Sequence, residues 1–381
     1  MPIHSMPILI EEIAVGKNHC SPAVQLKGVI KQFGNVVAVQ KLDLVFEEGS
    51  LVTLLGPSGC GKTTILRMIA GLETPTEGDI YIKGKRVNDV PIHKRNLGMI
   101  FQNYALFPHK TIFDNVAFGL KYRDVAKNEV EGKVKKALEM VRLPGVENRM
   151  PSQLSGGQQQ RIAMARAIVI EPDVLLMDEP LSALDENLRE EMRREIDNLQ
   201  QILGVTTVFV THDQREALSM SDKIVVMNEG LKQQEGSPEE VYNLPNNHFV
   251  ADFLGHSNFF KGVVADQEGD MISLELRDGN VFRVKHPGQW EPGDPVEMVV
   301  RAQSFKVTSV DEQPPEQGMN TFDGIIKDRS YMGGEVSYFV QLESGTMVHA
   351  IGLAKLRAIR KNTSVRVHVA PRHCGLLRVA E

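Results

Sequence analysis

Cysteine is scarce in this chain of 381 residues, which has only Cys20, Cys60 and Cys374. Their odd number and wide spacing argue against a disulfide framework or a zinc site and favour a reducing cytoplasm. No apolar run approaches the ~18 residues that a transmembrane helix needs. Residues 1–10 lack the charged-then-apolar pattern of a signal peptide. If the protein serves a membrane, we therefore expect it to do so by docking on a partner.

A surplus of basic residues is also missing. The chain has 43 lysines and arginines against 49 aspartates and glutamates, a net charge of −6 at pH 7. The overall charge therefore gives no electrostatic case for binding nucleic acid or an anionic membrane. With 42% hydrophobic and 24% charged residues, the composition is that of a soluble globular protein. Its length allows two or three domains.

One glycine-rich stretch organises the rest of the chain. It fits the pattern G-x-x-x-x-G-K-[ST], which forms phosphate-binding loops. A buried-strand run at Ser50–Leu55 precedes it, and a helix with one apolar side follows from Thr64 to Leu72. The stretch consists of Gly56, Pro57, Ser58, Gly59, Cys60, Gly61, Lys62, Thr63 and Thr64.

This order of strand, glycine turn and helix provides what phosphate binding requires. Glycines let backbone N–H groups converge on phosphate oxygens, and the helix N-terminus adds positive potential. Lys62 supplies a point charge for the β- and γ-phosphates, and the Thr63 hydroxyl a ligand for Mg²⁺. We expect Lys62 to be a solvated loop charge and Cys60 to be a reactive thiolate near the helix N-terminus. The alternatives are a glycine-rich turn without a ligand and an inert cysteine that fills space.

Two acids and a histidine follow further buried-strand runs. Ligands bind at the carboxyl ends of parallel strands. Asp178 is therefore placed to hold Mg²⁺, directly or through water, and Glu179 to polarise an attacking water. His212 follows the run Val205–Val210 and could contact a γ-phosphate. The acids could instead cap a helix, and the histidine could be a solvent-facing loop residue.

Two other stretches leave function and structure open. Val24–Val45 carries two short strand-like runs around Phe33-Gly34. Phe33 lies upstream of the glycine-rich loop, where it can stack on adenine or pack in the core. The run Leu154–Arg161 opens a helix, and Ser155 sits where a helix cap would. The paired Gly156 and Gly157 would let a backbone approach closely. As a lone motif, this run could be only a helix cap.

The pattern of apolar and polar residues divides the chain into three parts. Residues 1–23 show no periodicity and suggest a loose extension. Residues 24–255 mix buried-strand runs with helices, and a helical insertion at about residues 103–165 separates two halves of an α/β core. Residues 256–381 alternate as short strands, which indicates a small barrel or sandwich of the OB type. The predicted strands are Ile272–Leu276, Val281–Val284, Val296–Val300, Ser337–Leu342, Met347–Ala350 and Val365–Val369. This part holds 15 basic and 16 acidic residues, so its charge does not favour the oligonucleotide binding known for OB barrels.

Taken in order, these motifs resemble those of ABC-transporter ATPases. The resemblance covers residues 24–381 and includes the C-terminal β domain typical of solute importers. It implies a P-loop NTPase (RecA-like) core with a helical subdomain and a C-terminal all-β, OB-like domain. The motifs are the phosphate loop, Gln102, Leu154-Ser155-Gly156-Gly157-Gln158, Asp178-Glu179, Ser182-Ala183-Leu184-Asp185 and His212.

The resemblance also implies a site shared between two copies of the chain. Each ATP, with its Mg²⁺, would lie between the phosphate loop of one copy and Ser155, Gly156, Gly157 and Gln158 of the other. Further roles follow from the same resemblance. Glu179 would be the catalytic acid/base, His212 would contact the γ-phosphate, and Gln102 would sense nucleotide and help ligate Mg²⁺. Asp185 would link the subunits, and Phe33 matches the adenine-stacking aromatic, although tyrosine is commoner there.

The partners implied are transmembrane permease subunits and, indirectly, a solute-binding protein, with no nucleic acid. The protein would be peripheral on the cytoplasmic face of the inner membrane, and Tyr104–His109 would receive the permease. A polyamine, ferric iron or a phosphonate would be the solute. Arg301-Ala302-Gln303 stands where many relatives have Arg-Pro-Glu, and Lys232 replaces a usual apolar residue. Because of these departures, the resemblance does not carry a regulatory role over to the C-terminal domain.

Two other functions compete with import. Non-transport ABC ATPases that act on nucleic acid or ribosomes usually carry two cassettes or long coiled-coil insertions, whereas this chain has one cassette and an acidic balance. A P-loop kinase or GTPase would leave Leu154–Arg161 and His212 unexplained.

Overall fold

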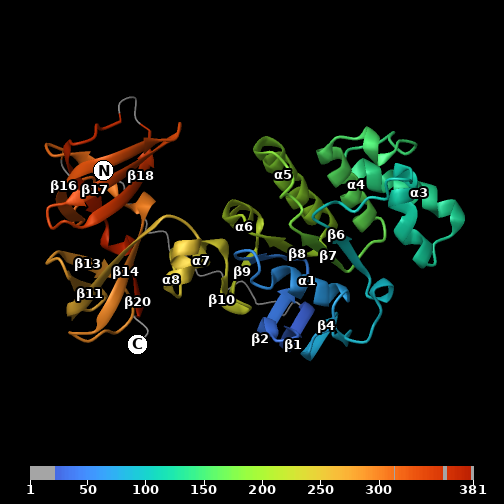
Figure 1. Ribbon diagram of the computed structural model, residues 1–381, viewed down its shortest axis with the longest axis horizontal. Coiled ribbons are helices and arrows are strands. Elements are labelled where there is room, and N and C mark those ends of the chain that lie inside the picture. Colours follow the sequence, from blue (N-terminus) through green and yellow to red (C-terminus); the bar gives the residue numbers. More distant parts are fainter. Residues whose placement is uncertain (1–21, 313, 355–357, 379–381) are drawn as a thin grey trace, which may run out of the picture.

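The computed structural model shows two bodies joined through two short helices (Figure 1). It describes residues 22–312, 314–354 and 358–378. Most of the predicted N-terminal extension, with Cys20, lies outside the described residues. The joining helices are α7 (Pro238–Asn243) and α8 (His248–Phe253). We call the part that ends with α8 the N-terminal body, and the part that begins with strand β11 (Ser257–Glu268) the C-terminal body.

A six-stranded sheet forms the centre of the N-terminal body, in the order β10-β9-β3-β8-β7-β6. All neighbouring pairs are parallel except β10 and β9. Every residue of β3, β7 and β8 is buried, as expected of parallel strands covered on both faces. The strands are β3 (Leu51–Leu55), β6 (Leu97–Ile100), β7 (Val174–Asp178), β8 (Thr206–Thr211), β9 (Lys223–Asn228) and β10 (Leu231–Gly236).

A second, antiparallel sheet packs beside the central one, in the order β2-β1-β4-β5. The sequence suggested two short strands around Phe33, but β1 and β2 each have 12 residues and pair through several bulges. Its strands are β1 (Pro22–Phe33), β2 (Val36–Glu47), β4 (Glu77–Ile82) and β5 (Lys85–Arg86). Helix α1 (Lys62–Ala70) lies in the core between the two sheets, where Ile65, Leu66 and Ile69 are fully buried.

A helical layer covers one end of the central sheet, at the far right of Figure 1. It shares a hydrophobic core with β6, β7 and the long helix α5. The α/β core with a helical subdomain, predicted from the sequence, is confirmed. The helices of the N-terminal body besides α1, α7 and α8 are α2 (Ile112–Ala117), α3 (Lys127–Met140), α4 (Gly156–Ile168), α5 (Glu186–Leu203) and α6 (Gln214–Met220). Short 3₁₀ turns lie at Ile92–Lys94, Phe118–Tyr122 and Pro151–Gln153.

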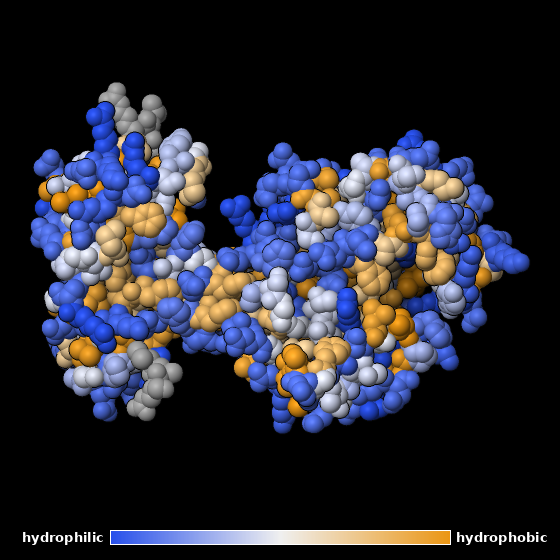
Figure 2. Space-filling model, in the orientation of Figure 1, coloured by the Kyte–Doolittle hydropathy of each residue, from blue (hydrophilic) through white to orange (hydrophobic). Residues whose placement is uncertain are grey.

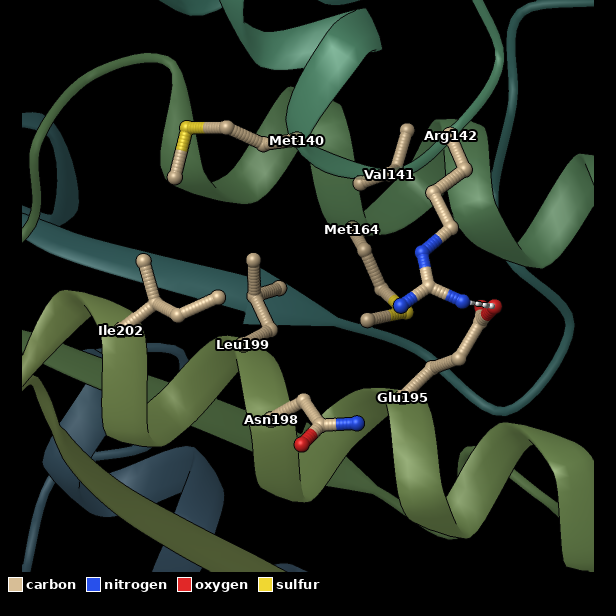
Figure 3. A pocket seen from close by; sticks show the side chains of 8 residues that line it. All are labelled: Met140, Val141, Arg142, Met164, Glu195, Asn198, Leu199 and Ile202. Atoms are coloured by element: carbon tan, nitrogen blue, oxygen red, sulfur yellow. Dashed lines mark ion pairs between the residues drawn. The ribbon is translucent and has the colours of Figure 1, made fainter.

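A small cleft of about 60 Å³ separates the helical layer from α5 (Figure 3). Met140 and Met164 line its upper wall, and Leu199 and Ile202 its lower wall. A carboxylate oxygen of Glu195 lies 2.9 Å from the Arg161 guanidinium and 3.7 Å from that of Arg142. Burial raises the pKa of Glu195, and the charges of these two arginines oppose this shift. The cleft contains none of the predicted nucleotide-binding residues.

The C-terminal body consists of two five-stranded antiparallel sheets around one hydrophobic core. The predicted all-β character is confirmed, although the sequence analysis missed β11, β15, β16 and β20. The first sheet has the order β13-β12-β11-β14-β20, with β12 (Met271–Leu276), β13 (Val281–Lys285), β14 (Pro295–Arg301) and β20 (Cys374–Arg378). The second has the order β15-β19-β16-β17-β18, with β15 (Lys306–Ser309), β16 (Asn320–Tyr331), β17 (Glu335–Leu342), β18 (Met347–Leu353) and β19 (Ser364–Val369). Short 3₁₀ turns lie at Ala302–Ser304 and Pro371–His373.

The visible surface is mostly hydrophilic, with small scattered apolar patches and a narrow waist between the two bodies (Figure 2). Among the residues that the structure describes, no helix has the length and apolar character needed to cross a membrane.

A fully buried histidine holds the second sheet of the C-terminal body together. The His368 ring nitrogens lie 2.9 Å from the Thr308 hydroxyl and 2.9 Å from the Thr321 hydroxyl. Burial lowers the pKa of His368, and the nearby Arg366 lowers it further. Burial is also the main cause that lowers the pKa of His286, His349 and His373 in this body. Burial in the folded C-terminal body therefore favours the neutral form of these imidazoles.

We predict that acid destabilises the C-terminal body. When the folded pKa of a histidine lies below its unfolded value, the unfolded state binds more protons as pH falls through the ordinary value of about 6.5. The melting temperature followed by emission of Trp290, the single tryptophan, should therefore fall by several degrees between about pH 7.5 and about pH 5.5. His368→Gln should weaken this dependence, whereas His93→Gln, at an exposed site in the N-terminal body, should preserve it. A melting temperature that stays constant or rises on acidification would contradict the assignment.

Candidate nucleotide site

The glycine-rich loop connects the end of β3 to the start of α1, and two of its glycines are required by close contacts. A Cβ atom on Gly56 would lie 2.2 Å from the carbonyl oxygen of Met227. One on Gly61 would lie 2.6 Å from the carbonyl oxygen of Ala38, and Gly61 also has a φ of 101°, which L side chains rarely adopt. A Cβ atom on Gly59 would meet nothing within 4 Å, so the loop is open on that side. Of the other loop residues, Ser58 is exposed, and Pro57, Thr63 and Thr64 are half-buried.

Lys62 is buried, which corrects the expectation of a solvated loop charge. Only 4% of the residue is exposed. Its ammonium donates hydrogen bonds to the carbonyl oxygens of Gly56 at 2.7 Å and Pro57 at 2.9 Å. Because Lys62 is the first residue of α1, its side chain can fold back along the loop, whose carbonyls take the place of water. The charge is thus held inside the loop by neutral acceptors, and an anionic phosphate would be a stronger partner.

Cys60 is also buried, which contradicts the expectation of an accessible, reactive thiol. Its side chain belongs to the hydrophobic core that contains Val39 and Ile65, and its sulfur lies 3.6 Å from the Lys62 ammonium. The sequence placed Cys60 correctly in the loop but could not give the direction of its side chain. Within this loop, Cys60 can offer a ligand its backbone, while its thiol fills space in the core.

Thr63 and Asp178 form the most direct contact between the loop and the neighbouring strands. The Thr63 hydroxyl donates a hydrogen bond of 2.8 Å to the Asp178 carboxylate at the end of β7. Burial raises the pKa of Asp178, while the Thr63 hydrogen bond and the charges of Arg67 and Lys62 oppose this shift. A hydroxyl and a carboxylate oxygen are therefore held side by side, close to the loop lysine.

Glu179, His212 and Gln102 come together beside this pair from three separate segments. One Glu179 carboxylate oxygen lies 3.3 Å from His212 Nδ1 and 3.5 Å from the Gln102 side-chain nitrogen. The Glu179 side chain is 18% exposed and that of His212 is 53% exposed. Neither Asp178 nor Glu179 caps a helix, the alternative role for these acids. The backbone of Glu179 has a φ of 45°. The site thus has a carboxylate that is accessible to water between a histidine and an amide.

Phe33 lies at the end of β1, beside the tight turn into β2. It is 45% exposed and lies outside the hydrophobic core, so the alternative of plain core packing finds no support. The Lys31 ammonium lies 4.4 Å from the centre of its ring. The face of an accessible aromatic ring at this position could take part in stacking.

The run from Leu154 builds the start of α4. The Ser155 hydroxyl accepts a hydrogen bond from the Gln158 N–H, and the Gln158 side chain bonds back to the Ser155 N–H in a capping box. Ser155 and Gly156 are exposed, whereas Gly157 is buried, and a Cβ atom on Gly157 would lie 3.0 Å from Leu188 of α5. The segment is thus a helix cap, as the structural alternative proposed, and it also presents an exposed helix N-terminus.

The segment Tyr104–His109 forms an irregular loop before α2. Tyr104 and Ala105 have positive φ values of 60° and 48°. The Arg166 guanidinium donates to both of their carbonyl oxygens, at 2.7 and 2.6 Å. The fully buried Asn115 accepts from the Phe107 N–H and donates to its carbonyl oxygen. The loop therefore has a defined shape despite its lack of regular structure.

The sequence analysis missed the supporting roles of Asn115 and Arg166. A signal was available for Arg166, which lies in the otherwise apolar run Ile162–Ile168 of α4, whereas Asn115 follows another polar residue, Asp114, in α2. The loop carbonyls that Arg166 binds, at Tyr104 and Ala105, are distant in the sequence and are brought near only by the fold. Those that Asn115 binds lie nearby in the chain, between Phe107 and Thr111, but local sequence does not show that its side chain turns toward them.

Comparisons with known families match both bodies. The family described as "ABC transporter" matches residues 39–182, and the one described as "TOBE domain" matches residues 298–377.

Curated relatives match nearly the whole chain. It is 44% identical over 359 residues to the "Spermidine/putrescine import ATP-binding protein PotA" of Rubrobacter xylanophilus, a match that covers 93% of each chain. It is 44% identical over 355 residues to the "Fe(3+) ions import ATP-binding protein FbpC 1" of Rhizobium meliloti, covering 93% of this chain and 98% of that one.

Solved structures resemble the N-terminal body. The cbiO1 protein of Clostridium perfringens, part of the ABC transporter complex cbiONQ, aligns with a TM-score of 0.55 and 27% identity, covering 58% of this chain and 90% of that one. The dimeric bacterial ABC transporter cassette MJ0796 aligns with a TM-score of 0.51 and 33% identity, covering 56% of this chain and 98% of that one. A post-hydrolysis structure of that cassette, bound to ADP and Pi, aligns equally well.

We predict that a maleimide labels both Cys60 and Cys374 slowly in the folded protein. Both thiols are buried, and burial raises the pKa of Cys374 to about 12. Labelling, mapped by mass spectrometry, should accelerate when denaturant opens the fold. As a matched control, Ser58→Cys would place a thiol at an exposed position of the same loop and should label quickly. Fast labelling of native Cys60 that MgATP suppresses would contradict its burial.

Proposed function

The chain belongs to the family of ABC-transporter ATP-binding proteins, and we propose that two copies of it hydrolyse ATP to drive import of a small solute through a membrane permease. One observation carries the proposal at the level of chemistry. The Thr63–Asp178 pair lies beside the Glu179–His212 pair at the carboxyl ends of parallel strands, next to the loop that holds Lys62. This combination suits transfer of a phosphoryl group to water.

The reaction is hydrolysis of the bond between the β- and γ-phosphates of bound ATP. Lys62 would exchange its bonds to the Gly56 and Pro57 carbonyls for β- and γ-phosphate oxygens. Glu179 would accept a hydrogen bond from the attacking water and hold it in line. As the new P–O bond forms and the bond to the ADP oxygen breaks, Glu179 would take the proton of the attacking water and release it to solvent with the products. His212 would contact the γ-phosphate where negative charge concentrates. Positioning and charge therefore supply the catalysis, and the protein forms no covalent intermediate.

Mg²⁺ fits the oxygen donors of this site. The Thr63 hydroxyl, the Asp178 carboxylate and the Gln102 amide would hold it, and the ion would neutralise charge on the phosphates. Among the residues that the structure describes, no three histidines, cysteines or acids cluster to hold a metal by themselves. This suits Mg²⁺, which usually keeps several waters and binds through one or two carboxylates plus substrate phosphates.

A second copy of the chain would complete each site. The exposed N-terminus of the 13-residue helix α4 offers N–H groups and positive potential to a phosphate. We propose that Ser155, Gly156, Gly157 and Gln158 face the nucleotide of the partner copy, while Phe33 stacks on the adenine held by its own chain. A site divided in this way hydrolyses ATP only when the dimer closes, and closure is a rigid-body change that a docked permease can use.

The permease would bind at Tyr104–His109 on the cytoplasmic face of the inner membrane, with a solute-binding protein acting indirectly. The named relatives import spermidine and putrescine or Fe(3+) ions, so we propose a polyamine or ferric iron as the solute. A role on nucleic acid or ribosomes is not favoured, because the matching relatives are import proteins and the net charge is −6.

Substitution of the catalytic acid should trap ATP. Glu179→Gln keeps the size of the side chain but removes the charge that polarises water. Hydrolysis should fall steeply, and about one ATP per chain should remain after rapid desalting, held by the closed dimer. Adding Ser155→Arg should release the ATP, because a bulky cation would obstruct the approach of the two copies. Lys62→Ala is the control for loss of nucleotide contacts within one chain. Equal retention by Glu179→Gln with and without Ser155→Arg would show that Ser155 does not face the nucleotide.

Substitution of Phe107 should uncouple transport from hydrolysis. The Phe107 ring lies 4.6 Å from that of Phe118, and Asn115 fixes its backbone, so the ring is presented on an ordered loop. In reconstituted membranes, Phe107→Ala should reduce uptake at least about tenfold, as for an aromatic anchor of an interface, and spare basal ATP hydrolysis. Leu244→Ala removes an apolar residue that is 70% exposed elsewhere in the N-terminal body and serves as the control. Normal uptake by Phe107→Ala would show that the permease docks on another surface.

A further inference from the structure

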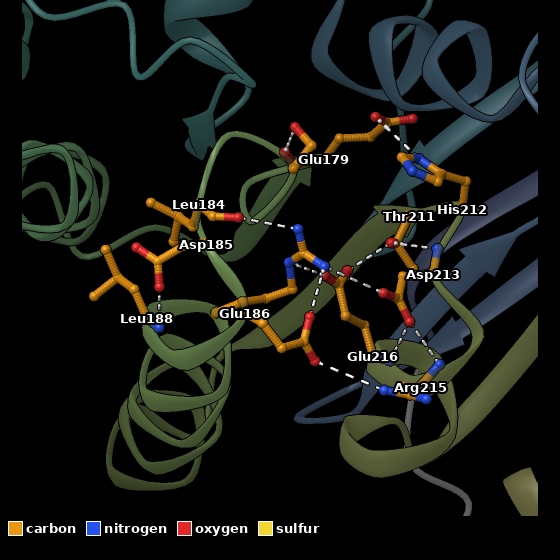
Figure 4. A network of polar contacts seen from close by, with 12 residues as sticks. Glu179, Leu184, Asp185, Glu186, Leu188, Thr211, His212, Asp213, Arg215 and Glu216 are labelled. Carbon is orange, nitrogen blue, oxygen red and sulfur yellow. Dashed lines mark hydrogen bonds and ion pairs between the residues drawn. The ribbon is translucent and has the colours of Figure 1, made fainter. Parts of the chain in front are cut away.

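Arg189 lies in the first turn of α5, between two segments near Glu179. One is residues 182–185, which follow Glu179 in the chain, and the other is residues 211–216, the His212 loop. Its guanidinium donates a hydrogen bond of 3.0 Å to the Leu184 carbonyl oxygen. It also forms ion pairs with Glu186 at 3.1 Å, Asp213 at 3.7 Å and Glu216 at 3.8 Å. Figure 4 shows these acceptors converging from both sides. One arginine thus contacts the segment after Glu179 and the segment after His212.

Glu216 connects Arg189 to the histidine loop. It is 4% exposed and accepts a hydrogen bond of 2.6 Å from the Thr211 hydroxyl. The same hydroxyl accepts the Asp213 N–H at 3.0 Å, so Glu216 holds both residues that flank His212. Burial raises the pKa of Glu216, and the charges of Arg189 and Arg193 oppose that shift. Removing Arg189 would therefore leave a buried acid with one fewer cation.

These contacts connect Glu179 to Arg189 by two routes, one through the segment that follows Glu179 and one through the His212 loop. The Ser182 hydroxyl donates to the Glu179 carbonyl oxygen at 2.9 Å, which fixes the start of the segment that leads to Leu184. On the other side, the His212 ring lies 3.3 Å from the Glu179 carboxylate. Among the described residues, Arg189 is the only one whose side chain makes polar contacts with both segments. It donates a hydrogen bond to the segment 182–185 and forms ion pairs with residues 211–216. Arg189 therefore links the two segments directly.

The hydrogen bonding of the Arg189 guanidinium is incomplete. The Arg189 Nε atom is buried and donates no hydrogen bond to any described residue, while its nearest acid, Glu216, is 3.8 Å away. A hydrogen bond between them would need a distance near 3 Å, so a shift of less than about 1 Å would form it. The arginine can thus hold two spacings of the loops that differ in bonding.

We propose that Arg189 is a positioning residue that couples the segment Ser182–Asp185 to the His212 loop, and so sets Glu179 for water attack when the second copy binds. This inference rests on the proposed function, because the segment Ser182–Asp185 matters to the chemistry only if a partner copy presses on it. In that case, contact on one side moves the Leu184 carbonyl, Arg189 follows, and Glu216 and Thr211 carry the movement to His212. Arg189 itself touches neither ATP nor water.

The test separates positioning from folding and from nucleotide binding. We would compare wild type, Arg189→Lys, Arg189→Met and Glu216→Gln in the full-length chain. The measured quantities are kcat, the steepness of its dependence on ATP concentration, and the affinity for a fluorescent ATP analogue. Arg194→Met is the matched control, since Arg194 lies on the same helix, is 73% exposed and pairs only with Glu190 among the described residues.

Arg189→Met should lower kcat by about ten- to a hundredfold, the range expected when reacting groups are misplaced by about 1 Å, with nucleotide affinity changed less than about twofold. The dependence on ATP concentration should become less steep, because the two sites no longer sense each other. Arg189→Lys should recover part of kcat, since it restores the charge without the planar fork. Glu216→Gln should share the defect, and combining it with Arg189→Met should add little further loss.

The results also distinguish the failure of this inference from failure of the proposed function. If wild type and Arg194→Met do not hydrolyse ATP, the proposed function is wrong, and the inference falls with it. If they hydrolyse ATP and Arg189→Met keeps normal kcat and steepness, the inference alone is overturned. It is also overturned if kcat falls only in proportion to nucleotide affinity or to the folded fraction measured by melting. Should Arg189→Met fail to fold, Arg189→Lys and Glu216→Gln decide the question by the same measurements.

Discussion

The register between three parallel strands sets the distances on which the chemistry depends. β3 pairs with β8 so that Leu55 lies beside Thr211, and β8 pairs with β7 so that Val210 lies beside Asp178. Adjacent strands are about 4.8 Å apart, so the loops that follow these strands start close together. A slip of one residue would turn every side chain of a strand to the opposite face. Since all three strands are buried on both faces, their tight packing resists such a slip.

The chemical groups of the candidate site can be read from local sequence, but the directions of their side chains cannot. The glycine loop, the acids at the end of β7 and His212 come at the ends of buried runs that are readable one segment at a time. Lys62 and Cys60 were misjudged because their burial depends on the core beneath the loop. Arg189 went unnoticed for a related reason. Its partners at Leu184, Asp213 and Glu216 belong to two loops that only the fold brings together.

The C-terminal body shows the same limit for strands. The long strands β11 and β16 escaped prediction because bulges interrupt their alternation, between Val264 and Asp266 and between Ile326 and Asp328. Arg301, in the stretch that departs from the usual pattern, contributes to the joint between the bodies. It donates to the Tyr242 and Ala251 carbonyls and stacks 4.3 Å from the Tyr242 ring. Burial lowers its pKa, and carbonyl groups take the place of an acidic partner.

Asp178 and Glu179 are adjacent in sequence, yet their backbones give them different roles. Asp178 ends β7 with its side chain bonded to Thr63 and is 7% exposed, so its carboxylate faces the phosphate loop. The Glu179 N–H still bonds to the Val210 carbonyl, which extends the strand ladder by one residue. Its φ of 45° then turns the chain out of the sheet, a conformation that side chains other than glycine adopt at a cost of about 1–3 kcal/mol. That strain is tolerated because the ladder on one side and Ser182 on the other hold the turn. The turn carries the Glu179 carboxylate away from the paired oxygens of Thr63 and Asp178 and toward His212. Under the proposed function, these two carboxylates one residue apart would serve as metal ligand and general base, because the strand ends between them.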